Sequence, residues 1–104
     1  AHNGIQLNRM KYEYIFDPDK NRKLKNERGV GFEDIIALVD AGYLVDVVDN
    51  PNTRKYPSQR FYVVDVAGYI HLVPFVRDGH RIYLKTIYPS RKATRNYMGG
   101  KEVL

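Results

Sequence analysis

Apolar residues between positions 32 and 42 recur with the period of an α-helix. Phe32, Ile35, Ile36 and Val39 stand at positions i, i+3, i+4 and i+7, so they form one stripe along a helix. Gly42 follows as a stop signal, because glycine tolerates the left-handed conformation in which helices often end. The pattern therefore predicts an amphipathic helix that covers the core.

The preceding segment carries the start and stop signals of another helix but has almost no apolar residues. Asp17 can cap free N–H groups, and the fixed φ of Pro18 suits the first helical position. Gly29 ends the segment, and Leu24 is the one large apolar residue in its body. We therefore expect a helix over residues 18–28 with most of its surface in water.

The remaining segments read as strands that are followed by one short helix. The predicted strands cover residues 11–16, 44–49, 60–67, 69–77 and 81–88, and residues 50–59 read as a surface loop. Pro89 ends the last strand, and Ser90 can cap a helix from Arg91 to about Met98. The expected fold class is α+β: a mainly antiparallel sheet of about four to five strands, two N-terminal helices packed on one face, and a short C-terminal helix.

The two tight turns of the predicted meander, Ala67-Gly68 and Asp78-Gly79, set the facing of its strands. If both are two-residue loops, the core face carries Val64, His71, Thr86, Val73, Leu84, Phe75 and Ile82, and the open face carries Val63, Leu72, Lys85, Phe61, Pro74, Tyr83, Asp65, Ile70 and Ile87. Lys85 would then lie mid-sheet on the open face. A three-residue second turn that includes His80 would reverse that facing.

Length and composition indicate one folded domain. The 104 residues allow a single modest core. We interpret residues 1–10 as an N-terminal tail or remnant and residues 11–104 as the domain. Cysteine is absent, and no apolar run approaches the ~20 residues of a membrane helix, so we expect a cytoplasmic protein that makes no membrane contact.

Positive charge is concentrated in one terminal stretch. Residues 81–97 hold five bases and no acidic residue, whereas the whole chain has 17 Lys+Arg against 12 Asp+Glu. Without these five the chain is neutral, so the formal charge of +5 lies here. Three tyrosines alternate with the bases. Because cations replace the counterions of a phosphate backbone and aromatic rings stack on bases, nucleic acid is the first partner to consider.

Other chemistries lack their motifs. His2, His71 and His80 do not have the spacing of metal ligands, and no serine stands in a Gly-x-Ser-x-Gly turn. These observations disfavour a zinc enzyme and a hydrolase triad, and we expect neither a metal nor a cofactor.

Several short motifs resemble the BrnT family of type II toxins. They are Asp17-Pro18 with Lys20, Gly29-Val30 with Phe32-Glu33, and the terminal Ser90-Arg91-Lys92-Ala93-Thr94, and the similarity spans residues 12–97. The family usually has Lys-His before the glycine, where Glu27 and Arg28 stand here, and an Asn where Leu24 stands. The resemblance implies a RelE-like fold, ribonuclease activity on RNA, and inhibition by a cognate antitoxin through which oligomers could form.

The resulting hypothesis is metal-independent RNA cleavage in which the substrate's own 2′-hydroxyl attacks the adjacent phosphate. Lys85 and Arg91 would hold the phosphate, with His71 or Asp65 transferring a proton. The RNA-binding candidates are Arg81, Tyr83, Lys92, Arg95 and Tyr97. Each residue also has an ordinary structural interpretation: Lys85 as a solvated strand residue, His71 and Tyr97 as packing residues, and Asp65 as the partner of a neighbouring base.

Two other functions use the same surface. A non-catalytic module that binds nucleic acid or an antitoxin would bind in a salt-dependent way without cleavage. A DNA-binding regulator is the weaker alternative, because the sequence has no evident helix-turn-helix.

Overall fold

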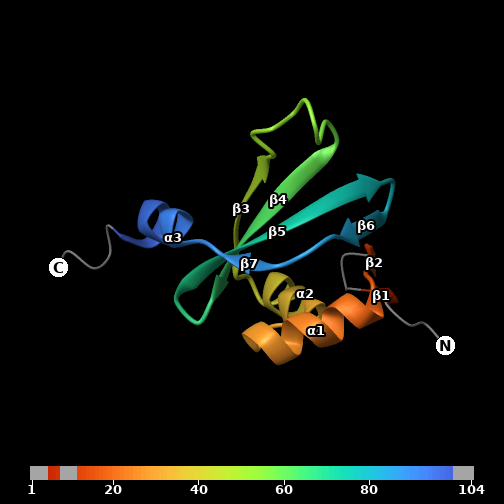
Figure 1. Ribbon diagram of the computed structural model, residues 1–104, viewed down its shortest axis with the longest axis horizontal. Helices are drawn as coiled ribbons and strands as arrows, with labels where there is room; N and C mark the ends of the chain where they lie inside the picture. The colour runs from red at the N-terminus through yellow and green to blue at the C-terminus, as the bar shows by residue number, and fades with distance from the viewer. Residues whose placement is uncertain (1–4, 8–11, 100–104) are drawn as a thin grey trace.

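The protein, described here from a computed structural model, has an α+β fold in which three helices pack on one mixed sheet (Figure 1). The structure describes residues 5–7 and 12–99, and all counts refer to these residues. In chain order the elements are β1 (Ile5–Leu7), β2 (Glu13–Ile15), α1 (Pro18–Arg28), α2 (Phe32–Asp40), β3 (Leu44–Asp49), β4 (Gln59–Val66), β5 (Tyr69–Asp78), β6 (Arg81–Leu84), β7 (Tyr88–Pro89) and α3 (Arg91–Met98).

The described part of the sheet has seven strands in the order β1-β2-β6-β5-β4-β3, with β7 paired to β5 beyond the end of β6. One pair, β2 with β6, is parallel, and the other described pairs are antiparallel. The prediction of about four to five strands missed β1 and β7, which are only three and two residues long. Strand β1 lies within the segment predicted to be a tail, whose other residues fall outside the described part of the chain.

The core lies between α2 and one face of the sheet, which we call the inner face. The predicted stripe is confirmed: Phe32, Ile35 and Ile36 are almost fully buried. They pack against Tyr62 of β4 and Phe75 of β5, among others. Helix α1 buries only Leu24, in agreement with its polar sequence, and Figure 1 shows α1 and α2 together below the sheet.

The two N-terminal helices are joined by a tight Gly-Val-Gly link. Gly29 adopts a φ of 76°, which ends α1 as predicted. Gly31 has an extended backbone and is needed for another reason: a Cβ at this position would lie 2.6 Å from the Asn21 Oδ1 atom. That oxygen accepts a hydrogen bond from the Phe32 N–H at 2.7 Å. The link therefore fixes the start of α2 against α1.

The β4–β5 hairpin has the predicted register, with Val64 opposite His71. The second hairpin turns at Gly79-His80 rather than at Asp78-Gly79, so Leu84 lies opposite Phe75 instead of Val73. The pairing is thus displaced by two residues. Because side chains alternate between the two faces of a sheet, an even displacement leaves each side chain of β6 on its predicted face. Accordingly Ile82 and Leu84 are buried on the inner face as expected.

Strand β6 ends at Leu84, four residues earlier than predicted. The Lys85 N–H still donates to the Pro74 carbonyl at 2.8 Å, but Pro74 has no N–H to return the second bond of this pair. When the chain rejoins β5 at β7, Leu72 lies opposite Tyr88 and His71 opposite Pro89, which is a register one residue removed from that of β6. Residues 85–87 therefore form a bulge.

The bulge changes which side chains reach the two faces. Ile87, predicted on the open face, is fully buried in the inner core. Thr86, predicted on the core face, lines the same surface pocket as Lys85. Both predictions were wrong because they assumed an uninterrupted strand, and a one-residue insertion reverses the alternation that follows it.

Candidate nucleic-acid interface

Helix α3 is fixed on the outer face of the sheet, opposite to α2. Ser90 caps the helix by accepting from the Ala93 N–H at 3.0 Å. The Thr94 Oγ1 atom accepts from the Ile70 N–H of β5 and donates to the Ser90 carbonyl, both at 2.8 Å. The Tyr97 hydroxyl donates to the Asp46 carboxylate of β3 at 2.7 Å. These bonds join α3 to a central and an edge strand.

A pocket of about 400 Å³ opens beside the bulge, and we call it the lysine pocket. Lys85 and Thr86 line it from the bulge, Tyr88 from β7 and Lys20 from α1. The other lining residues are Asn50, Tyr56, Gln59, Phe61 and Pro74, from the β3–β4 connection and the outer face of the sheet. The pocket thus combines two ammonium groups with three aromatic rings.

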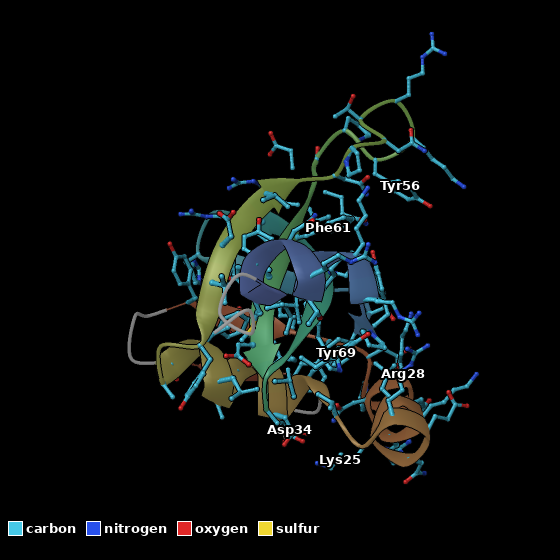
Figure 2. The ribbon with its side chains drawn as sticks, turned by 90° about the vertical axis from the view of Figure 1, so that its left-hand side faces the viewer. Lys25, Arg28, Asp34, Tyr56, Phe61 and Tyr69 are labelled. Atoms are coloured by element: carbon cyan, nitrogen blue, oxygen red, sulfur yellow. The ribbon has the colours of Figure 1, made fainter. Side chains whose placement is uncertain are left out.

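A second hollow of about 350 Å³, the α3 groove, lies between α3 and the outer face. Its lining comprises Val48, Asp49, Pro51, Phe61, Val63, Leu72, Ser90, Lys92, Ala93, Asn96 and Tyr97. Phe61 lines both cavities, and in the view onto α3 of Figure 2 it lies with Tyr56 on the same side of the molecule. The two cavities therefore adjoin at Phe61.

The cations around these cavities have no acidic partner within the part of the chain that the structure describes. The ion pairs among the described residues join Arg22 to Asp19, Lys25 to Asp34, Arg60 to Asp49, and Arg81 to Glu13. None of them includes Lys20, Lys85, Arg91, Lys92 or Arg95. The carboxylates nearest the groove are already engaged, Asp49 by Arg60 at 3.0 Å and Asp46 by Tyr97. The positive charge of these side chains is therefore not neutralised by carboxylates of the described residues.

Of the four catalytic candidates, Lys85 and Arg91 are exposed and unpaired in the described part of the chain. His71 is buried on the inner face, with its Nδ1 atom 3.1 Å from the Tyr69 carbonyl. The Asp65 carboxylate accepts from the Gly68 N–H at 2.8 Å and so closes the β4–β5 turn. The fold does not bring His71 or Asp65 together with Lys85.

The RNA-binding candidates divide into two groups. Lys92 and Arg95 are exposed on α3, and the hydroxyl of Tyr97 is held by Asp46. Tyr83 neighbours Lys85, whose Nζ atom lies 5.7 Å from the centre of the Tyr83 ring. Arg81, at the start of β6, forms an ion pair with Glu13 at 3.0 Å. Arg81 is therefore engaged within the fold and does not line either cavity.

Burial and hydrogen bonding shift the pKa values of two tyrosines and one carboxylate at this surface. Burial raises the pKa of Tyr88 further above its usual value, which itself lies well above neutral pH, so its hydroxyl is protonated there and can donate a hydrogen bond. The hydrogen bond to Asp46 and partial burial likewise raise the pKa of Tyr97. Reciprocally, the Tyr97 hydroxyl and then the Val47 N–H lower the pKa of Asp46.

Sequence reasoning missed Lys20, Tyr56 and Tyr88 as members of the site. Lys20 belongs to a helix that lies 65 residues before Lys85 in the chain, and only the packed fold brings the two lysines to one pocket. Phe61 was predicted on the open face, which placed it on the correct surface without a function. In the sequence, the feature that pointed to this surface was the predicted open-face row of Phe61, Pro74 and Tyr83.

Comparison with models of protein families, with curated proteins and with solved structures found no match to this chain. The described residues contain no group of three or more His, Cys, Asp or Glu side chains able to hold a metal ion. Among the same residues, no helix is long and apolar enough to cross a membrane.

Proposed function

We propose that this chain is a ribonuclease toxin of a type II toxin–antitoxin system, related to the BrnT family and RelE-like in fold. The observation that carries the proposal is the lysine pocket. Its two ammonium groups have no acidic partner among the described residues, and aromatic rings stand beside them. The exposed bases of α3 extend the positive surface on the same face. Single-stranded RNA has the phosphates and unstacked bases that such a surface attracts.

In the proposed reaction the 2′-oxygen attacks the adjacent phosphorus, the bond to the 5′-oxygen breaks, and a 2′,3′-cyclic phosphate and a free 5′-hydroxyl result. Lys85 and Lys20 stabilise the negative charge that develops on the phosphate, and Arg91 holds a neighbouring phosphate. The Tyr88 hydroxyl, in the same pocket, donates a hydrogen bond to the phosphate. His71 lies on the inner face, so the proton of the 2′-hydroxyl passes to water in the open pocket, and the departing 5′-oxygen takes up a proton from water in the same pocket.

The test compares the parent protein with Lys85→Ala, Arg91→Ala and Lys23→Ala on single-stranded RNA. Removing one preorganised donor typically lowers the rate ~10²- to 10³-fold, and we expect a loss of that order for Lys85→Ala. Lys23 is an exposed α1 residue outside both cavities and serves as the matched control. The products should end in a 2′,3′-cyclic phosphate, and a 2′-deoxy substrate should stay intact. Equal cleavage by the parent and the Lys85→Ala protein would refute the proposal.

A non-catalytic RNA- or antitoxin-binding module is the second candidate. It is favoured by the positions of His71 and Asp65, which leave the pocket without an imidazole or a free carboxylate. This function predicts binding that weakens steeply with salt and no RNA fragments at any protein concentration. A cognate antitoxin is tested by expressing the neighbouring reading frame with this chain: relief of growth arrest and co-purification are the expected results.

A further inference from the structure

The α3 groove differs in chemistry from the lysine pocket that it adjoins. Its floor consists of apolar side chains of the sheet, Phe61, Val63 and Leu72, and Ala93 faces them from the helix. We do not expect a phosphate group to bind in this groove, because burying a charge among apolar groups is costly. A flat, largely apolar ring suits a hollow of about 350 Å³ between a sheet and a helix.

Polar groups at the groove are few and differ in availability. Asp49 is paired with Arg60, and the Ser90 hydroxyl already caps α3. The exposed Asn96 amide makes no hydrogen bond with the described residues, so its donors and acceptor are free to bind the edge of a ring. Lys92 stands at the rim with no carboxylate partner among the same residues.

The two cavities lie next to each other on the outer face. Phe61 belongs to both of them, and Leu72 of the groove is the cross-strand partner of Tyr88 of the lysine pocket. Asn50 and Pro51, adjacent in the chain, line one cavity each. A strand with one phosphate at Lys85 would therefore carry a neighbouring nucleotide past Phe61 and into the groove.

We propose that the α3 groove binds one unstacked base of the same RNA strand whose phosphate occupies the lysine pocket. The base lies between Phe61 and the Ala93 side of α3, Asn96 contacts its edge, and Lys92 faces the backbone. This inference rests on the proposed RNA-binding function. Stacking against an aromatic ring tolerates every base, whereas the Asn96 amide adds a preference among bases.

The test measures binding without cleavage, using fluorescence anisotropy and labelled 2′-O-methyl octanucleotides. One probe is octauridine, and the other is an abasic octamer with the same sugars and phosphates. Since stacking contributes about 1–3 kcal/mol per base, the parent protein should bind octauridine about 5- to 150-fold more tightly than the abasic probe.

Three variants separate the groove from the rest of the surface. Ala93→Leu fills the groove and should remove most of the preference for octauridine while leaving abasic binding unchanged. Arg95→Ala, an exposed α3 residue that does not line the groove, should weaken the two probes equally. Asn96→Ala keeps the space open and should alter only the ranking of homopolymers of the four bases. Circular dichroism checks that each variant is folded.

Each outcome decides between the two proposals. If neither probe binds at low salt, the RNA-binding function itself fails. If both bind equally well and in a salt-dependent way, RNA binding stands and the base site is overturned. A preference that survives Ala93→Leu places the stacked base elsewhere, at Tyr56 or Tyr88, and also overturns the inference. If Ala93→Leu changes the oligomeric state of the protein and leaves the base preference unchanged, the groove is a protein contact, and the inference is overturned as well.

Discussion

The attachment of α3 to the sheet depends on Thr94, and Thr94→Val tests it. The substitution keeps the shape of the side chain but removes the oxygen that accepts from the Ile70 N–H and donates to the Ser90 carbonyl, each at 2.8 Å. Ile70 is fully buried, so its N–H would lose its partner in a place that water hardly reaches. Leaving a buried donor unsatisfied costs about 1–3 kcal/mol.

For a domain of this size, that loss corresponds to a melting temperature lower by roughly 4–20 °C. The assay is thermal unfolding followed by circular dichroism, together with amide hydrogen exchange at Ile70, which should become faster. Thr94→Ser is the matched control, because it retains the hydroxyl and loses only a methyl group. The reasoning is refuted if Thr94→Val melts within about 1 °C of the parent and leaves the Ile70 amide equally protected.

Two further predictions concern the contact between α1 and α2. Gly31→Ala should lower the free energy of unfolding by about 1–3 kcal/mol in a urea titration, because its Cβ would lie 2.6 Å from the Asn21 Oδ1 atom and would displace this acceptor from the Phe32 N–H; parent-like stability would contradict this reasoning. Partial burial acts to raise the pKa of Asp34, but the Gly31 N–H and the Lys25 ammonium outweigh it, so the pKa is lowered. This carboxylate therefore stabilises the fold above its unfolded pKa, near 3.8, and the contribution is lost as the pH falls through the lower folded pKa. Asp34→Asn should flatten the acid limb of a stability–pH curve, and a curve that keeps the parent's slope would count against this assignment.

The elements that local chemistry determines were predictable from the sequence. The cap at Asp17, the glycine stop at Gly29 and the stripe that begins at Phe32 depend only on neighbouring residues, and the helices begin where these signals placed them. The β4–β5 register followed from the Ala67-Gly68 turn. The facing of Lys85 was also correct, although the turn before it was misplaced, because an even shift of pairing keeps each side chain on its face.

The remaining features depend on contacts between distant segments. Nothing near Ile87 indicates that the strand leaves the sheet after Leu84; that follows from the position of Pro74, ten residues earlier in the chain. The parallel pairing of β2 with β6 likewise joins segments almost 70 residues apart. For the same reason, Lys20 and Tyr56 could not be assigned to the site without the packed fold.

The bulge at residues 85–87 depends on the N–H group that Pro74 lacks. Any other amino acid at this position would supply an N–H that can complete the pair with Lys85 and allow β6 to continue along β5. In a continuous strand, Lys85 would stay on the outer face, whereas Thr86 would turn to the inner face and leave the pocket. The lining of the pocket therefore depends on a hydrogen-bond donor that Pro74 lacks, so a substitution at this one position in the pocket wall can change the pocket without removing a single cation.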